Sequence, residues 1–320
     1  MEYRPLGRSG LRVSEISLGS WLTYGRTVEE DVTRSCILRA YELGINLFDT
    51  ANAYHTGAAE ESLGRVISEL PRTDLVIATK VFFPMGQGPN DRGLGRKHVT
   101  EQCHASLRRL GVEYIDLYQS HRFDPDVPVD ETLRALEDLV QAGKVLYLGV
   151  SQWSGEQIRD AVGMQERMGW HRMISNQPQY NMLVRTIEDD AIPASEKAGV
   201  GQIVWSPLAQ GVLTGKYRPG APLPENTRGA DPSSNSFMEP LLQPPVLEAV
   251  ERLRPIADEA GISLAQLALA WVLRQPNVAS AIVGATRVEQ VETNAAAAGI
   301  RLDPDALSRI DEALAEVVRR

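Results

Sequence analysis

One unit recurs along this 320-residue chain: a stretch with helical periodicity, then a glycine, then a short apolar run. Glycine accepts the left-handed backbone conformation that ends a helix, and a run rich in β-branched residues favours a strand. The four plainest copies have Gly44, Gly111, Gly143 and Gly199 before residues 45–48, 112–118, 145–150 and 200–205. Each copy predicts one helix-to-strand connection, and such alternation is typical of a parallel sheet.

The alternation continues to the end of the chain and predicts eight strands. They lie near residues 16–18, 45–48, 75–79, 115–119, 145–150, 173–176, 202–205 and 280–283. Eight parallel strands close into a barrel, so we expect an α/β protein with the (β/α)8, or TIM barrel, fold and one domain over residues 1–320. Capping-box spacings mark helix starts at residues 27–30, 154–157 and 263–266.

Two segments interrupt the alternation. Residues 6–13 predict a β-hairpin around Arg8-Ser9-Gly10 that plugs the N-terminal end of the barrel. Residues 218–245, after the predicted seventh strand, are rich in proline and form a long loop; in a compact domain such a loop is usually a lid or binding loop. A predicted helix over residues 246–259 resumes the pattern, so we place no domain boundary there.

Polar side chains stand where three of the apolar runs end. Asp49, Lys80 and His121 close the second, third and fourth predicted strands, and Tyr54 follows Asp49 within one loop. Taken singly, these residues fit a helix cap, a solvated lysine and a satisfied loop histidine. A parallel barrel, however, gathers the C-terminal ends of its strands at one mouth. Four such placements in register therefore indicate a catalytic centre.

Charge and cysteine content narrow the class of protein. The formal charge of −9 disfavours nucleic acid or an anionic membrane as a partner, because the field of the whole protein repels phosphate. Cys36 and Cys103 are far apart and have no metal-ligand spacing, as expected of thiols in a reducing compartment. The polar start of the chain and the absence of any apolar run near ~18 residues predict a cytoplasmic protein without a membrane span.

Several motifs resemble the aldo-keto reductase superfamily across essentially the whole chain. They are LFDTANAY at residues 47–54, ATK at 78–80, VWSPL at 204–208 and IVGA at 282–285. Within it, the chain most resembles the branch of the voltage-gated potassium channel β subunits and their bacterial relatives, through residues 44–51, 93–98, 205–209 and 215–217. The resemblance implies an NADPH-dependent carbonyl reductase on a (β/α)8 barrel, with the cofactor extended across the mouth.

The four strand-end residues suit carbonyl reduction. Hydride addition leaves an alkoxide that needs a proton, and Tyr54 is a poor donor unaided because the ordinary pKa of tyrosine is about 10. We expect the Lys80 ammonium to lower that pKa and Asp49 to hold Lys80 charged, while His121 donates a hydrogen bond to the substrate oxygen. The family's catalytic tetrad falls on these residues. Channel-subunit relatives commonly have asparagine at the position of His121, so the histidine favours turnover.

The resemblance also implies a set of cofactor contacts near the strand ends. Trp205 is expected to stack on the nicotinamide, and Arg287 to read a 2′-phosphate at a helix N-terminus. The full expected set is Ser20, Trp21, Asp49, Ser151, Gln152, Gln177, Trp205, Ser206, Pro207, Leu208, Gln210, Lys216, Arg228, Gly284, Thr286, Arg287, Gln290 and Asn294. No Gly-x-Gly-x-x-Gly fingerprint accompanies a strand-to-helix turn, which disfavours Rossmann-type binding. We favour NADPH over NADH, although Gln152 and Thr293 depart from the family pattern.

The sequence leaves two other functions open. One is a cofactor-binding redox sensor or regulatory subunit with little turnover, and the other is a metal-dependent lyase or hydrolase using Asp49 and His121. The second is weak, because metal sites need several converging ligands and one histidine alone is predicted at the mouth. The expected substrate is a small carbonyl compound in an aromatic pocket formed by Trp21, Tyr24, Phe82, Phe83, Met85 and Trp153. A homo-oligomer is possible, as symmetric assembly is common.

Overall fold

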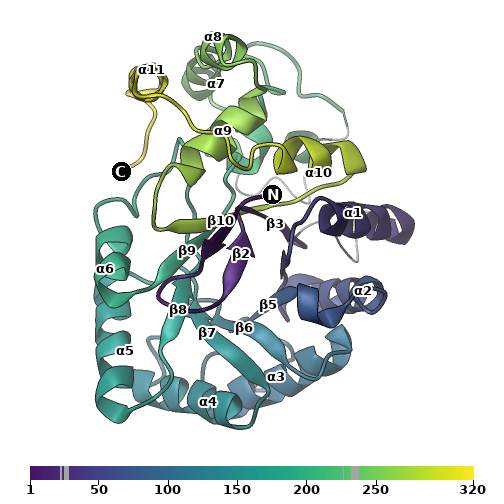
Figure 1. Ribbon diagram of the computed structural model, residues 1–320, viewed down its shortest axis with the longest axis vertical. Coiled ribbons are helices and arrows are strands. Elements are labelled where there is room, and N and C mark those ends of the chain that lie inside the picture. The colour runs from purple at the N-terminus through teal and green to yellow at the C-terminus, as the bar shows by residue number, and fades with distance from the viewer. Residues whose placement is uncertain (22–23, 25–28, 226, 232–237) are drawn as a thin grey trace.

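The computed structural model describes residues 1–21, 24, 29–225, 227–231 and 238–320, and its centre is a closed barrel of eight parallel strands (Figure 1). The strands follow the order of the chain, with the last pairing to the first. They are β3 Ile16–Gly19, β4 Leu47–Asp49, β5 Val76–Val81, β6 Ile115–Ser120, β7 Val145–Val150, β8 Met173–Asn176, β9 Gly201–Trp205 and β10 Val278–Val283. The predicted (β/α)8 barrel is confirmed.

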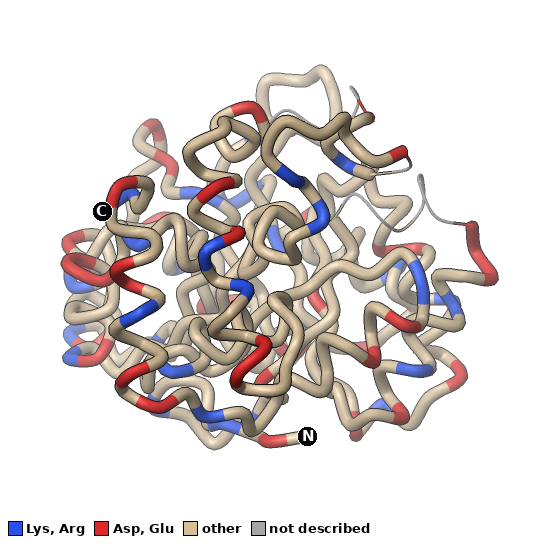
Figure 2. Tube along the Cα trace, turned by 90° about the horizontal axis from the view of Figure 1, so that it is seen from above, with Lys and Arg blue, Asp and Glu red and all other residues tan. Residues whose placement is uncertain are grey.

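Helices surround the barrel (Figure 1), and acidic and basic residues are interspersed along the chain (Figure 2). They are α1 Glu30–Glu42, α2 Ala58–Ile67, α3 Arg96–Leu110, α4 Val129–Gln141, α5 Gly155–Met168, α6 Ala191–Ala198, α7 Pro244–Glu251, α8 Arg254–Glu259, α9 Leu264–Leu273, α10 Val288–Ala295 and α11 Pro304–Leu314. The capping boxes at Ser154 and Ser263 are present in full. The one predicted at residues 27–30 begins outside the described residues.

The helix expected over residues 246–259 is two helices, α7 and α8. Pro255, in the first turn of α8, has no N–H to donate to the carbonyl of Glu251, so a continuous helix would lose a hydrogen bond there. The chain turns at Arg252 and Leu253 instead. Among the described residues no single helix is long and apolar enough to cross a membrane; only the bent pair Pro244–Glu259 and Leu264–Leu273, with an 89° break, passes that test jointly.

The glycines that precede the strands have the expected conformation. Gly44, Gly111, Gly143 and Gly199 have φ values of 85°, 67°, 67° and 73°, in the left-handed region that costs other residues energy. Gly111 and Gly199 directly follow α3 and α6 as helix C-caps. This conformation turns the chain out of each helix and into the next strand, which fixes where each strand starts.

The N-terminal hairpin consists of β1 Tyr3–Pro5 and β2 Arg12–Ser14, which pair antiparallel in a sheet of their own. Leu6, at its turn, is fully buried and packs in one apolar cluster with Leu47, Leu117 and Ile203 of the barrel strands. Gly7 lies so close to the barrel that a Cβ there would be 2.4 Å from the carbonyl oxygen of Ile174. The hairpin therefore seals the end of the barrel where the strands begin.

The opposite end of the barrel, where the strands finish, carries buried polar side chains. Strands β5, β6 and β10 are buried along their whole length, as expected of strands covered on both faces. At the C-terminal ends of β4, β5 and β6 the interior changes from apolar to polar, with Asp49, Lys80 and Gln119 all buried. Burying such groups is costly unless they bond to one another, so this end is organised by a hydrogen-bonded network.

Candidate active site

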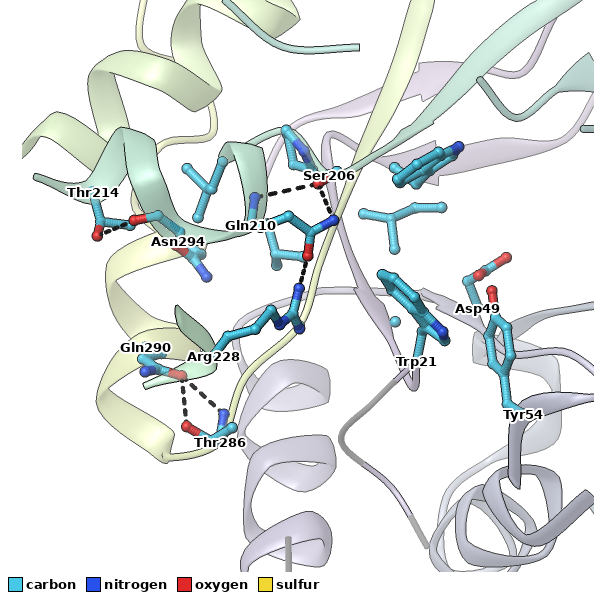
Figure 3. Close-up of a pocket in the computed structure, with 18 of the residues that line it drawn as sticks. Trp21, Asp49, Tyr54, Ser206, Gln210, Thr214, Arg228, Thr286, Gln290 and Asn294 are labelled. Carbon is cyan, nitrogen blue, oxygen red and sulfur yellow. Dashed lines mark hydrogen bonds between the residues drawn. The ribbon is translucent and has the colours of Figure 1, made fainter. Parts of the chain in front are cut away.

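A cavity of about 1130 Å³ opens at the C-terminal end of the barrel, and segments that end or follow all eight strands line it. Most of the residues predicted for catalysis or cofactor binding lie on its wall (Figure 3). They are Trp21, Asp49, Tyr54, His121, Ser151, Gln177, Trp205, Ser206, Pro207, Leu208, Gln210, Lys216, Arg228, Gly284, Thr286, Arg287, Gln290 and Asn294. The fold thus brings together residues separated by more than 200 positions in the chain.

Three predicted residues do not line the cavity. Lys80 lies beneath its floor and is fully buried, where it touches the cavity only through its partners. The Ser20 hydroxyl is also buried and donates to Thr50 Oγ1 at 2.8 Å. Gln152 has a φ of 60°, which turns its side chain to the surface, where its oxygen accepts the N–H of Gln179. Ser20 and Gln152 therefore do not line the cavity, and their expected contact with the cofactor stays a prediction.

The floor of the cavity is built around the Lys80 ammonium. Its Nζ donates to Asp49 Oδ1 at 2.5 Å, to the Thr50 carbonyl at 2.8 Å and to Tyr54 Oη at 3.2 Å. Asp49 and Lys80 come from the adjacent strands β4 and β5, while Tyr54 opens the short 3-10 helix η1 Tyr54–Gly57. All three hydrogen-bond donors of the ammonium are used, so Lys80 has one defined position beside the phenol.

The second carboxylate oxygen of Asp49 is held as well. Gln177 Nε2, at the end of β8, donates to Asp49 Oδ2 at 2.8 Å, and Gln119 Nε2 in β6 lies 3.4 Å from the same oxygen. The Ser151 hydroxyl in turn donates to the Gln177 carbonyl at 2.8 Å. This network fixes the orientation of the buried carboxylate, because both of its oxygens accept hydrogen bonds.

Burial and neighbouring charges have opposing effects on the pKa values of Lys80 and Tyr54. Burial alone would lower the pKa of Lys80, but the charge of Asp49, together with Tyr54, outweighs burial and raises it, so the ammonium persists. Burial raises the pKa of Tyr54, and the charge of Lys80 only partly offsets that increase. The prediction that Lys80 brings the pKa of Tyr54 below its ordinary value is therefore wrong in its net direction. The phenol keeps its proton at neutral pH and is ready to donate it.

His121 faces Tyr54 across the cavity floor. Its ring centroid is 5.7 Å from that of Tyr54 and 4.8 Å from that of Phe83, both in edge-to-face contact. Burial, with the nearby charges of Lys80 and Arg122, holds the pKa of His121 well below its usual range, so the imidazole is neutral. Its Nδ1 is buried and has no hydrogen-bond partner among the described residues. A neutral imidazole next to a protonated phenol offers hydrogen bonds without adding charge.

The turn after β9 forms another side of the cavity. Ser206, Ala209 and Gln210 all have positive φ, a conformation that L-residues rarely adopt and that often marks functional sites. Gln210 Nε2 donates to Ser206 Oγ at 2.9 Å, and Arg228 donates to Gln210 Oε1 (Figure 3). The guanidinium of Arg228 lies 5.6 Å from the ring centroid of Trp21, which meets Trp205 edge to face.

The far end of the cavity lies where β10 leads into α10. Gln290 Oε1 accepts the backbone N–H of Thr286 at 2.8 Å and its hydroxyl at 3.3 Å (Figure 3). Arg287 is the N-cap residue of α10, with a side chain 67% exposed and 3.9 Å from Glu289. Asn294 is buried one helical turn beyond Gln290. The N-terminus of α10, with the exposed Arg287 guanidinium beside it, is suited to bind an anionic group.

Some residues that line the cavity were not predicted, and some residues predicted to form the substrate pocket do not line the cavity. Of the expected aromatic pocket, only Trp21 and Phe83 line the cavity. Trp153, for example, is buried against Phe123 with ring centroids 5.1 Å apart. The unpredicted lining residues include Arg122, directly after His121, together with Pro84, Thr214, Glu225 and Thr227. Adjacency to His121 at a strand end was the signal that could have identified Arg122.

The site thus combines a buried lysine between an acid and a tyrosine with a histidine opposite, at the mouth of a parallel barrel, an arrangement suited to proton transfer. The sequence profile of the Aldo/keto reductase family matches residues 15–315. The chain belongs to this family, and it is an NAD(P)H-dependent oxidoreductase. The described residues contain no group of three or more His, Cys, Asp or Glu side chains that could hold a metal ion.

Individual relatives carry two kinds of name. A "probable voltage-gated potassium channel subunit beta" of Arabidopsis thaliana is 42% identical, over 100% of this chain and 98% of the relative. A protein of the same name from Oryza sativa is 40% identical, over 97% and 96%. An L-glyceraldehyde 3-phosphate reductase of Escherichia coli K12 is 36% identical, over 99% and 93%. The resemblance to the channel-subunit branch is thus confirmed.

Proposed function

We propose that the protein reduces aldehydes and ketones to alcohols with NADPH, and that Tyr54 supplies the proton. One observation carries the proposal: Lys80 Nζ bonds at once to the Asp49 carboxylate and to the Tyr54 hydroxyl on the cavity floor, with a neutral His121 facing them. This arrangement holds a proton donor, the cation that stabilises its conjugate base and a second hydrogen-bonding group around one point.

The wall of the cavity suits a nicotinamide dinucleotide. Its volume of about 1130 Å³ exceeds that of most single-ligand sites, leaving room for an extended cofactor and a small substrate. Trp205, Ser151 and Gln177 would hold the nicotinamide end, while Gln210, Arg228 and the N-terminus of α10 would hold the phosphates and adenosine. When bound, the reduced cofactor supplies hydride to the carbonyl carbon.

The chain's own residues govern the proton. Tyr54 keeps its proton until negative charge develops on the substrate oxygen, because burial raises the pKa of the phenol. As the proton leaves Tyr54 Oη, the phenolate gains a charge-assisted hydrogen bond from Lys80, 3.2 Å away. His121 orients the substrate oxygen with a hydrogen bond and, being neutral, does not compete as an acid. Asp49 keeps Lys80 charged throughout.

The names of the relatives support two candidate functions, an aldehyde reductase and a regulatory subunit. The Escherichia coli relative's name specifies reduction of an aldehyde, which favours an aldehyde substrate here. The plant relatives' name specifies a channel subunit, which supports the second candidate, a cofactor-binding regulatory protein with little turnover. His121, in place of the asparagine common in that branch, favours the enzyme.

We further propose a cytoplasmic protein that acts on small carbonyl compounds and binds neither nucleic acid nor membrane, consistent with its charge of −9.

The direct test is consumption of NADPH. Purified protein should lower NADPH absorbance with an activated aldehyde such as 4-nitrobenzaldehyde, and a metal chelator should leave the rate unchanged. NADH should support a lower kcat/KM than NADPH. Tight NADPH binding without turnover of any compound in a broad aldehyde and ketone panel would reject the reductase in favour of the regulatory protein.

A further inference from the structure

Arg122 is a cation at the catalytic end of the cavity that the reduction itself does not require. It follows His121 directly after β6, lines the cavity and is half-buried. One of its five N–H groups donates to the His121 carbonyl from Nη1 at 2.6 Å, and its guanidinium carbon lies 5.5 Å from the ring centroid of Phe83. Its Nε and Nη2 make no hydrogen bond to any described residue.

No carboxylate of the cavity neutralises this charge. The acidic residues that line it are Asp49, Glu225 and Glu289, and none of them forms an ion pair with Arg122 in the described part of the chain. Asp49 is matched by Lys80. A half-buried guanidinium without a carboxylate beside it is unfavourable, because a charge removed from water is normally compensated by a charge of opposite sign. Among the described residues, the positive charge of Arg122 at the catalytic end of the cavity therefore has no carboxylate to compensate it.

The cofactor phosphates do not need this charge. The other cations on the cavity wall, Lys216, Arg228 and Arg287, belong to the segments after β9 and β10, away from the strand that carries Arg122. Arg122 instead shares its surroundings with the substrate-facing groups, since its charge is felt by both Tyr54 and His121. We therefore expect the counter-charge of Arg122 to be carried by the substrate, which Tyr54 and His121 face.

We propose that Arg122 selects carbonyl substrates that carry an anionic group, a carboxylate or a phosphate, on the chain attached to the carbonyl carbon. The planar guanidinium, with N–H groups still available, is suited to bind either anion through two parallel hydrogen bonds. Phe83, stacked near it and against His121, restricts where the guanidinium lies. This inference rests on the proposed reductase function and adds the class of its substrate.

The test compares matched acids and esters. The probes are 4-oxobutanoate and its neutral methyl ester, with glycolaldehyde phosphate and glycolaldehyde as the phosphate pair. Wild type should prefer the charged member of at least one pair by about tenfold or more in kcat/KM. Arg122→Gln should lower kcat/KM for that charged member by about 10- to 100-fold, mainly through KM, and change that of its neutral partner by less than about threefold. The pair that responds identifies the anion.

Two control variants separate recognition from structure. Arg122→Lys keeps the charge but not the planar fork, so it should recover part of the lost selectivity. Arg159→Gln removes an exposed arginine of α5 that does not line the cavity, and should behave as wild type. Equal losses for charged and neutral substrates in Arg122→Gln would assign Arg122 a structural role, and a wild type without charge preference in both pairs would also overturn the proposal.

A binding measurement keeps this inference separate from the reductase proposal. Calorimetric titration of the NADP⁺-saturated protein with butanoate and with inorganic phosphate should show binding of at least one of them in wild type and its loss in Arg122→Gln. If no aldehyde turns over but this Arg122-dependent binding is seen, the reductase fails and the anion site stands. If neutral aldehydes turn over and neither anion binds, the reductase stands and the anion site fails.

Discussion

At the scale of single residues, we propose that Lys80 controls both the chemistry and the local stability. It is fully buried, and its charge is compensated by Asp49 alone among the carboxylates of the cavity. Gln177 and Gln119 orient that carboxylate from two further strands. Removing the ammonium would both deprive the Tyr54 phenolate of its partner and leave a buried carboxylate without its counter-charge.

We therefore predict that Lys80→Met lowers kcat by roughly 100-fold or more and destabilises the protein by about 3 to 5 kcal/mol. The double variant Asp49→Asn/Lys80→Met removes both charges and should regain much of the stability while staying inactive. Urea unfolding and steady-state kinetics measure the two effects separately. A double variant no more stable than Lys80→Met would contradict the view that the uncompensated carboxylate causes the loss.

At the scale of elements, Asp49, Lys80 and His121 are positioned by the ends of β4, β5 and β6, and Tyr54 by the loop and short helix η1 that follow β4. The glycine turns position the starts of the strands that follow them. This is why the strands, and the clustering of Asp49, Tyr54, Lys80 and His121, could be predicted from the sequence: Gly111 and Gly199, for example, stop their helices in a conformation that few other residues tolerate. The directions of loop side chains could not be predicted. The turn of Gln152 away from the cavity depends on its φ of 60°, and the burial of Trp153 depends on contact with Phe123.

Helix α10 is the element proposed to set cofactor preference. If Arg287, at its N-cap, binds the 2′-phosphate, Arg287→Ala should weaken NADPH binding by about 1 to 2 kcal/mol and leave NADH binding nearly unchanged. The exposed contact with Glu289 at 3.9 Å is too weak to hold Arg287 away from the phosphate. Fluorescence titration with both cofactors measures the ratio. Equal weakening of NADPH and NADH would instead assign Arg287 to the adenosine or to the fold.

At the scale of the whole molecule, the two ends of the barrel have different tasks. The N-terminal hairpin closes one end with Leu6 and an apolar cluster, and the other end leaves a cavity over a polar floor. The alternation of helix and strand was enough to predict this division, because parallel strands carry all their C-terminal ends to one side. The importance of Arg122 was missed because it depends on the lack of a pairing carboxylate among the described residues of the cavity, which the sequence alone does not reveal.

We predict that Tyr54 donates the proton and does not hold the cofactor. The most direct measurement is the single-turnover rate of NADPH oxidation by an activated aldehyde in wild type and Tyr54→Phe, with NADPH affinity measured on the same preparations. Removing the hydroxyl should lower the rate by about 100-fold or more and leave the Kd for NADPH within about twofold. A Tyr54→Phe variant that keeps most of the wild-type rate, or that loses NADPH binding along with activity, would contradict the claim.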